Sequence, residues 1–277
     1  MITVIVPAHN EASVIERTLT ALTRDASPGE LDIIVVANGC TDETADRARG
    51  IDYPIRVIET EVGSKIHALN LGDQHARSFP RIYLDADVDL PTDDCRRLAS
   101  ALAPTGDLHL VSPRMDIDLE DRPWSVRAYY RIWTRLPYYR SKIGGVFAFS
   151  EEGRGRFDEW PDLIADDTFA STRVEPKEQA VIEGSRFRMS PPATLEALRR
   201  IEIRRRSGFS ELAERYPDLM ERRQRSQKTA LLLLGFRPWL WPALGVYLWT
   251  KLQTRWEAAR RIADGEGKAW LRDETTR

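Results

Sequence analysis

Apolar residues in the first part of the chain fall into short continuous runs separated by stretches with helical spacing. Residues 31–36 are a typical run, and residues 12–22, with apolar side chains three and four positions apart, are a typical helical stretch. The predicted strands are residues 2–6, 31–36, 55–58, 81–84 and 108–112, and the predicted helices are residues 12–22, 65–76, 92–102 and a helix that begins at Thr41. Because strand and helix alternate four times, we expect an α/β domain with a mainly parallel sheet covered on both faces.

Two of the predicted helices begin with a threonine that is followed by acidic residues. Thr41 precedes two acids, and Thr92 precedes Asp93 and Asp94. A threonine side chain can cap the first backbone N–H groups of a helix, and acids in the first turn interact favourably with the helix dipole. We therefore predict that both threonines are N-caps and that Asp93 and Asp94 are not ligands.

Polar residues follow each of the first four predicted strands. These segments are residues 9–11, 37–39, 61–65 and 85–87. In open α/β sheets, ligands bind outside the carboxyl ends of the strands. We therefore expect all four segments to lie at one edge of the sheet.

The last of these segments contains two carboxylates one residue apart, Asp85 and Asp87. Side chains two positions apart in a strand share a face, so both would point the same way where the strand leaves the core. Mg2+ and Mn2+ take oxygen ligands and are usually held by one or two carboxylates, with water and substrate phosphates completing the shell. The pattern also suits an ordinary strand end, so by itself it leaves both interpretations open.

Residues 124–167 contain three further candidates. The aromatic residues within 124–140 predict either an amphipathic helix packed on the sheet or a platform on which a sugar ring stacks. Gly144 and Gly145 precede a strand-like run, and glycine lets the backbone approach a ligand closely. Asp166 and Asp167 suit a helix N-terminus, but a neighbouring carboxylate can also raise a carboxyl pKa toward that of a general base.

The composition adds a division of charge along the chain. The 277 residues can form one large domain or two, and a hydrophobic content of 42% is sufficient for a core. Residues 199–277 carry 18 Lys and Arg against 10 Asp and Glu, whereas residues 1–198 carry 23 against 33. The basic part predicts contact with phosphate, diphosphate or a membrane surface. The first residues lack a signal-peptide pattern, and Cys40 and Cys95 suit reduced thiols, so we expect a cytoplasmic protein.

The C-terminal part combines arginines with apolar residues. Residues 195–206 predict a helix whose arginines spread over more than one face. Residues 229–250 are largely apolar but contain Arg237, Pro238 and Pro242, which disfavour a single membrane-spanning helix. Tryptophans and flanking basic residues suit a helix in the headgroup region. Interfacial or re-entrant association of residues 229–250 with a membrane is the preferred interpretation. Burial in a dimer or against the body of the protein, and a true membrane span, stay open.

Four segments carry a resemblance to a known family. The sequences VIVPAHNE, VVANGCTDETA, GSKIHALNLG and YLDAD, in this order and at these distances, resemble the nucleotide-binding half of family 2 glycosyltransferases, over residues 1–175. The resemblance implies the GT-A fold of nucleotide-diphospho-sugar transferases, with a mixed, mainly parallel sheet. We expect a catalytic domain at residues 1–190, with a nucleotide-binding half at 1–104 and an acceptor half at 105–190. A basic, partly apolar, helical and membrane-associating extension would follow at residues 191–277.

The resemblance also implies roles for individual residues. Lys65 matches a basic residue near the nucleotide diphosphate, Asp87 matches the direct metal ligand, and Asp85 matches the acid that supports the metal and contacts the sugar or ribose. Asp167 matches the base that removes the acceptor proton in an inverting transfer, with Asp166 as its supporting neighbour. The remaining matched residues are Pro7, His9 and Glu11 against the base and ribose, Asn38 near the base, and Gly144 and Gly145 under the donor sugar.

The chain departs from the family pattern at two places. Ala37 stands where the family often has an acid that contacts the base, so the base is not specified. A Q-x-x-R-W motif is absent from the sequence, which argues against a processive polymer synthase. We assign the diphosphate-closing role of that motif to the arginines of residues 204–206, including Arg204 and Arg206.

Together these inferences predict a glycosyltransferase that depends on Mn2+ or Mg2+. It would transfer a sugar with inversion from a nucleotide diphosphate donor, preferably a UDP- or GDP-sugar, to an acceptor hydroxyl. Peripheral contact through residues 229–250 would place it at the inner face of the cell membrane and suit a lipid-linked or cell-envelope acceptor, and no nucleic-acid partner is expected. The alternative is a membrane-associated nucleotide-sugar binding protein without transfer activity. A nucleotidyltransferase is disfavoured because residues 7–13, PAHNEAS, contain no glycine.

Overall fold

The computed structural model describes residues 1–104, 106–217, 232 and 234–263, which belong to two compact units. The first unit comprises Met1–Asp116, Ile143–Asp162 and Asp166–Arg188. The second comprises Ile117–Lys142, Leu163–Ala165 and the described part of Met189–Arg277. The domain boundaries predicted at residues 104 and 190 stay predictions.

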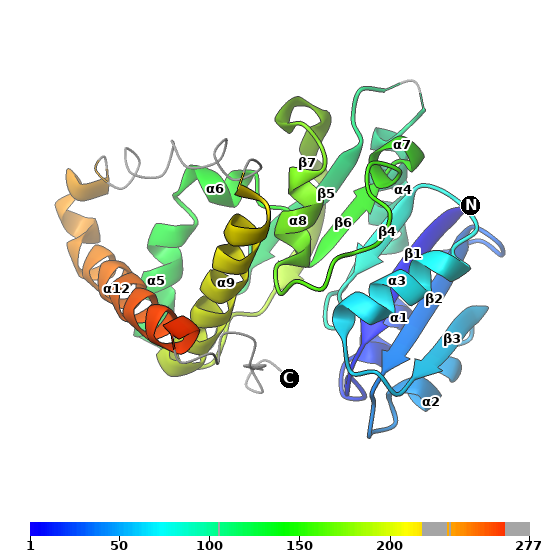
Figure 1. Ribbon diagram of the computed structural model, residues 1–277, viewed down its shortest axis with the longest axis horizontal. Coiled ribbons are helices and arrows are strands. Elements are labelled where there is room, and N and C mark those ends of the chain that lie inside the picture. Colours follow the sequence, from blue (N-terminus) through cyan, green and yellow to red (C-terminus); the bar gives the residue numbers. More distant parts are fainter. Residues whose placement is uncertain (105, 218–231, 233, 264–277) are drawn as a thin grey trace. The chain divides into compact units, whose positions relative to one another are not determined.

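The first unit is built on a seven-stranded sheet in the order β3-β2-β1-β4-β6-β5-β7 (Figure 1). Strands β3, β2, β1 and β4 are parallel, and β6 is antiparallel to β4 and to β5. The strands are β1 (Ile2–Ala8), β2 (Leu31–Asn38), β3 (Ile55–Thr60), β4 (Arg81–Leu84), β5 (Leu110–Ile117), β6 (Val146–Phe149) and β7 (Gln179–Met189). The predicted mixed, mainly parallel sheet is confirmed.

The strands in the middle of the sheet are the continuous apolar runs of the sequence. Ile5 of β1 lies opposite Ile34 of β2 and Tyr83 of β4, and all three side chains are buried. A parallel strand inside an α/β domain has no solvent-facing side, which explains why these runs do not alternate with polar residues. The register brings the carboxyl ends of β1, β2, β3 and β4 to one edge, as predicted.

Six helices and a short 3-10 turn belong to the described part of the first unit. They are α1 (Ile15–Thr23), α2 (Thr44–Arg49), α3 (Lys65–His75), α4 (Thr92–Ala101), α7 (Glu151–Arg154), α8 (Asp166–Thr172) and the 3-10 turn η1 (Pro176–Glu178). Helices α1, α3 and α4 coincide with predicted helices to within a few residues.

Both predicted threonine N-caps are wrong. The backbone N–H of Thr41 donates to Asn10 Oδ1 (2.7 Å), and α2 begins only at Thr44. Thr92 is already the first residue of α4, and its hydroxyl donates to the Leu22 carbonyl (2.7 Å). In each case a partner far along the chain holds the threonine, which local spacing does not reveal.

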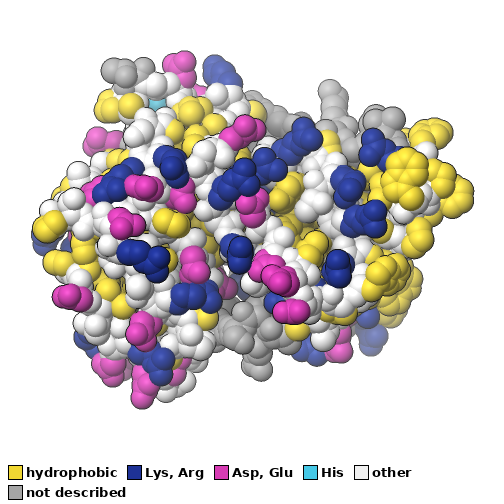
Figure 2. All heavy atoms as spheres, turned by 180° about the vertical axis from the view of Figure 1, so that it is seen from behind, with side chains coloured by type: hydrophobic (Ala, Val, Ile, Leu, Met, Phe, Trp, Pro, Cys, Tyr) yellow, Lys and Arg dark blue, Asp and Glu magenta, His cyan; other side chains and the backbone are white. Residues whose placement is uncertain are grey.

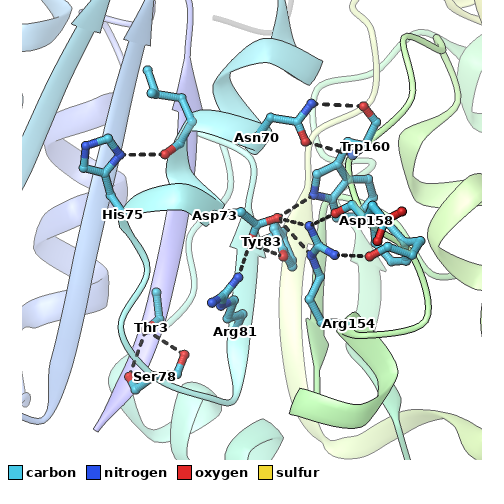
Figure 3. Close-up of polar contacts among 12 residues, drawn as sticks. Thr3, Asn70, Asp73, His75, Ser78, Arg81, Tyr83, Arg154, Asp158 and Trp160 are labelled. Atoms are coloured by element: carbon cyan, nitrogen blue, oxygen red, sulfur yellow. Dashed lines mark hydrogen bonds and ion pairs between the residues drawn. The ribbon is translucent and has the colours of Figure 1, made fainter.

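A buried carboxylate joins α3 to its surroundings. Asp73, in the last turn of α3, accepts hydrogen bonds from Arg81 Nη1 (2.7 Å) and Tyr83 Oη (2.7 Å) on β4. It also accepts from Arg154 Nε (3.0 Å) and Trp160 Nε1 (2.9 Å), and Figure 3 shows these side chains converging on it. The network fixes α3 to β4 and to the segment that precedes α8, and α3 and β4 lead directly into Lys65 and Asp85 of the candidate site.

The second unit is helical. Its helices are α5 (Trp124–Trp133), α6 (Pro137–Arg140), α9 (Leu195–Arg215) and α12 (Trp241–Ala263), with the 3-10 turn η3 (Pro238–Leu240) before α12. Helices α5, α9 and α12 pack against one another. Tyr129, Tyr130 and Trp133 of α5 are buried, and the Tyr129 ring lies 5.1 Å from that of Tyr247 on α12. Packing within the second unit therefore accounts for these three aromatic residues.

A buried ion cluster lies among these three helices. Glu202 of α9 pairs with Arg205 (2.9 Å) and with Lys251 of α12, and its side chain is 7% exposed. Burial alone would raise the pKa of the Glu202 carboxyl, but the charges of Lys251 and Arg205 lower it to about 2. Glu202 is therefore ionised and links α9 to α12.

The surface of the second unit carries large exposed apolar side chains. Figure 2 shows hydrophobic side chains gathered at one edge of the molecule, together with basic ones. The exposed members of η3, α12 and the residues just before them are Leu232, Phe236, Trp239, Trp241, Leu248, Trp249, Leu252 and Trp256. Within the described ranges, no helix is sufficiently long and apolar to cross a membrane.

Candidate active site

Lys65 connects two of the predicted acidic segments. Ser64 caps α3 by accepting a hydrogen bond from the backbone N–H of His67 (3.3 Å), which makes Lys65 the first residue of the helix. Its Nζ lies 2.7 Å from Asp85 Oδ1, just after β4, and 2.9 Å from Asp166 Oδ2, at the start of α8. One ammonium group thus bridges the end of a central strand and the start of a helix from the second half of the unit.

The charges at this site depend on one another. Burial alone would lower the pKa of the Lys65 ammonium, but the carboxylates of Asp166 and Asp85 outweigh it and raise that pKa. Burial raises the pKa of Asp85, and the charges of Asp87 and Asp167 raise it further against the opposing effect of Lys65. Burial likewise raises the pKa of Asp166, with Lys65 opposing and Asp167 and Asp85 adding. The site therefore contains more carboxylate charge than one lysine can balance.

This surplus of negative charge fits a divalent cation. Asp87 is exposed, three residues after β4 ends at Leu84. In the described part of the chain, no three His, Cys, Asp or Glu side chains form a group that could hold an ion. A Mg2+ site that substrate phosphates and water complete needs only one or two carboxylates from the protein.

The first predicted loop lies against the end of β2. His9 Nδ1 is 2.6 Å from the carbonyl oxygen of Asn38, the last residue of β2. Pro7 is buried within β1, and the backbone N–H of Glu11 donates to Thr44 Oγ1 (2.7 Å) at the start of α2. Pro7, His9, Glu11 and Asn38 thus belong to one edge of the sheet, where β1 and β2 end, and their roles toward a nucleotide stay predictions.

Gly39 allows the backbone to pass close to the next loop. Its φ is +60°, and a Cβ there would meet Gly63 Cα at 2.7 Å. Neither a left-handed backbone nor that contact suits a residue with a side chain. The loops after β2 and β3 can therefore lie side by side at this edge only with glycine here.

The glycine pair lies beside the acidic site. The Gly145 carbonyl accepts the backbone N–H of Asp85 (2.9 Å), so it directly positions the first acid of the pair. Gly145 has φ of +77°, and a Cβ there would lie 3.2 Å from the Phe187 ring. Gly144 forms an isolated bridge with Val146, and a place for both glycines under a donor sugar stays a prediction.

Asp166 and Asp167 begin α8, as the sequence pattern indicated. Asp166 is buried with 11% of its side chain exposed, and it holds Lys65. Asp167 is half-buried, and its Oδ1 accepts the hydroxyl of Thr168 (3.2 Å). The two neighbouring acids therefore differ in environment, because the first lies in an ion pair with lysine and the second is open to a larger share of solvent.

Arg204 and Arg206 lie on α9 in the second unit. Arg206 is exposed, and Arg205 between them is engaged by Glu202 and lies 5.9 Å from the centre of the Trp133 ring. The diphosphate role assigned to Arg204 and Arg206 stays a prediction.

Arg17 is a residue near the site that the sequence did not indicate. On α1, its Nη2 donates to the Asp87 carbonyl (3.2 Å), and its Nε donates to Asp89 Oδ1 (2.9 Å). It therefore fixes the backbone that carries Asp87. An arginine in the middle of a predicted amphipathic helix carries no signal of such a contact, because its partner lies 70 residues away.

The acidic site bridged by Lys65 lies at the carboxyl ends of the parallel strands, which is where open α/β sheets bind their ligands. Residues 3–175 match the family described as Glycosyl transferase family 2. The chain belongs to this family and is a glycosyltransferase, as the resemblance predicted.

Solved structures with a similar fold are also glycosyltransferases. One is a mannosyltransferase from Pyrobaculum calidifontis in complex with GDP-Man and Mn2+. Its alignment with this protein covers 95% of this chain and 79% of the mannosyltransferase, at 23% identity and a TM-score of 0.61. Glucosyl-3-phosphoglycerate synthase from Mycobacterium tuberculosis, in complex with Mn2+, UDP-Glc and phosphoglyceric acid, aligns 78% with 79% at 19% identity and a TM-score of 0.57. S. aureus TarS 1–349, in complex with UDP-GlcNAc, aligns 69% with 58% at 17% identity and a TM-score of 0.52. These likenesses confirm the GT-A-like fold, and a search of curated protein sequences found no match.

Proposed function

We propose that the protein is a metal-dependent, inverting glycosyltransferase that moves a sugar from a nucleotide diphosphate donor to an acceptor hydroxyl. The observation that carries the proposal is the bridge from Lys65 to Asp85 and Asp166 in a chain of glycosyl transferase family 2. The bridge unites the acids after β4 with the acid pair of α8, and transfer requires both a leaving-group site and a base.

In this proposal Asp87 and Asp85 hold Mn2+ or Mg2+. The charge surplus around Lys65 supports a cation there, and two carboxylates suit either ion. When bound, the ion stabilises the negative charge on the departing diphosphate. Lys65 keeps Asp85 and Asp166 in place and adds a positive charge on the diphosphate side.

Asp167 is the proposed general base. It accepts the proton of the acceptor hydroxyl as that oxygen attacks the anomeric carbon, and inversion follows from a single displacement. Its larger exposure relative to Asp166 supports this assignment, since a base must reach an incoming acceptor. Asp166, tied to Lys65, orients the start of α8.

The donor is proposed to bind along the edge where β1, β2 and β4 end. Pro7, His9, Glu11 and Asn38 would contact the base and ribose, and Gly144 and Gly145 would lie under the sugar. The solved structures with GDP-Man, UDP-Glc and UDP-GlcNAc support a UDP- or GDP-sugar. Arg204 and Arg206 are proposed to contact the diphosphate.

The acceptor is proposed to be lipid-linked or part of the cell envelope. The large apolar side chains exposed on η3 and α12 support an acceptor presented at a lipid surface. The transfer chemistry itself does not depend on this choice, since any hydroxyl in reach of Asp167 would serve.

A thermal-shift panel of UDP, GDP, CDP, dTDP and ADP, each with and without Mn2+, tests the proposal. A ligand at 100 times its Kd stabilises the folded state by about 2.7 kcal/mol, so binding of one diphosphate will raise Tm clearly. We expect a shift for one diphosphate that requires Mn2+ and is absent in Asp87→Asn. No shift with any diphosphate, on folded protein, would contradict the proposed donor site.

A further inference from the structure

Helix α12 has one face that its own unit buries. Ala243, Tyr247, Thr250, Thr254 and Ala258 are each at most 6% exposed. Their spacing of three and four residues places them on a single stripe of the helix. This inner stripe packs against α5 and α9, so the orientation of α12 within its unit is set.

The opposite face of α12 is apolar as well. An α-helix turns by 100° per residue, so residues 241, 248, 249, 252 and 256 of α12 point away from the inner stripe. With Trp239 of η3 they form what we call the outer apolar face, which comprises Trp239, Trp241, Leu248, Trp249, Leu252 and Trp256, exposed by 43% to 66%. A helix on the surface of a water-soluble protein normally carries polar residues on this side. Large contiguous apolar surface of this kind marks an interaction site.

Basic residues accompany the outer apolar face. Residues 234–260 contain four basic residues and one acidic residue. Three of the basic residues, Arg237, Arg255 and Arg260, are exposed, while Lys251 is paired with Glu202. The one acid, Glu257, pairs with Arg199 of α9 at 3.3 Å. The surroundings of the outer apolar face are therefore net positive.

We propose that the outer apolar face docks on the surface of a lipid bilayer that carries anionic headgroups. Tryptophan side chains favour the boundary between headgroups and acyl chains, and arginine favours anionic lipid phosphate. Docking lays α12 in the plane of the membrane, with its inner stripe still covered by α5 and α9. This binding goes beyond sugar transfer and does not require it, although it would bring the enzyme to the proposed lipid-linked acceptor.

Charge distinguishes a bilayer from a second copy of the chain. Two copies that met through this face would bring two sets of exposed arginines together, and like charges in contact oppose association. An anionic bilayer carries negative headgroup charge at the membrane surface, where the exposed arginines would lie when the outer apolar face is docked. The face therefore fits a membrane surface better than it fits itself.

Sedimentation of the full chain with phosphatidylcholine vesicles, with and without phosphatidylglycerol, tests the proposal. We expect binding that is stronger with phosphatidylglycerol and that weakens with salt. The triple variant Trp239→Ala, Leu252→Ala, Trp256→Ala removes apolar area from the outer apolar face only, and it should bind at least about tenfold more weakly. Arg255→Glu should lower binding about tenfold, and only to vesicles that contain phosphatidylglycerol.

Trp124→Ala is the matched control. Trp124 is 63% exposed, as large and as exposed as the substituted tryptophans, but it lies on α5. The control should bind vesicles like the unaltered chain. An equal loss in the control, or no vesicle binding by the full chain, would overturn the proposal.

Two further measurements separate the remaining outcomes. A dimer without lipid that the triple variant disrupts, measured by light scattering, would mean that a second copy occupies the face, and would overturn the proposal. The diphosphate-dependent thermal shift of the triple variant should equal that of the unaltered chain. If the triple variant loses vesicle binding and keeps the thermal shift, docking through the outer apolar face is supported. If neither protein shows a thermal shift, the proposed donor site is contradicted, and the vesicle assay still decides the docking proposal.

Discussion

Replacing Lys65 by methionine removes the charge at the centre of the site while keeping most of the side-chain volume. The ammonium interacts with Asp85 at 2.7 Å and with Asp166 at 2.9 Å. With an effective dielectric constant of about 20, each attraction is worth about 5 to 6 kcal/mol before the cost of removing the charges from water is subtracted. The lysine and Asp85 side chains are 29% and 35% exposed, so solvent screens part of this energy. We expect Lys65→Met to lower the free energy of unfolding by about 2 to 3 kcal/mol.

The assay is urea unfolding in the presence of EDTA, so that no added cation can replace the ammonium. The midpoint should fall while the slope stays unchanged, because the surface exposed on unfolding is the same. Lys177→Met is the control, since Lys177 is 78% exposed and pairs with Glu175 at 3.2 Å on the surface. An exposed pair of that kind is worth about 0 to 1 kcal/mol. Equal losses for the two variants would refute the inference that Lys65 holds the two acids together.

Three further substitutions test other parts of the structure. Asp73→Asn leaves the buried arginines that contact this residue without a full counter-charge, so urea unfolding should show a loss of about 3 to 5 kcal/mol, and a loss below about 1 kcal/mol would argue against the network. Gly145→Ala forces a left-handed backbone on alanine and a contact with Phe187, so Tm should fall by an amount equivalent to about 1 to 2 kcal/mol. Gly29 has the same φ of +77° but no atom within 4 Å of a Cβ, so Gly29→Ala measures the cost of the left-handed backbone alone. Glu202→Gln should cost about 3 kcal/mol at pH 7, because the folded pKa of Glu202, about 2, lies below its ordinary value of 4.5. That contribution is present above pH 4.5 and is lost as the pH falls toward 2, so the two proteins should converge there; a difference that persists at pH 2 would contradict the assigned ion cluster.

The parallel core was predictable because its strands leave a direct trace in the sequence. A strand such as β2, buried on both sides, must be apolar at nearly every position, and residues 31–36 show this without any other information. The same rule places the polar residue after each strand at one edge, so the meeting of Lys65 with Asp85 follows from the order of strands and helices.

The contacts that position the site were not predictable in the same way. Trp160 and Arg154 lie more than 80 residues from Asp73 along the chain, and nothing in their local sequence indicates that they contact it. The ion pair of Lys65 with Asp166 was not predictable either. The sequence suggested that Lys65 lies near phosphate, whereas the structure pairs it with two acids. Tertiary hydrogen bonds also replaced both expected helix caps, Thr41 and Thr92.

Donor turnover by Asp87→Asn and Asp167→Asn, measured with the diphospho-sugar that the thermal-shift panel identifies, tests the central claim most directly. Asp93→Asn is the control, because Asp93 is an exposed acid at the start of α4 that pairs with Arg96 and has no assigned role in transfer. We predict that Asp87→Asn loses both Mn2+-dependent donor binding and turnover. Asp167→Asn should bind donor normally but turn over about 100 to 10,000 times more slowly, as expected for loss of a general base. Unchanged turnover in both variants would contradict the assignment of sugar transfer to this site.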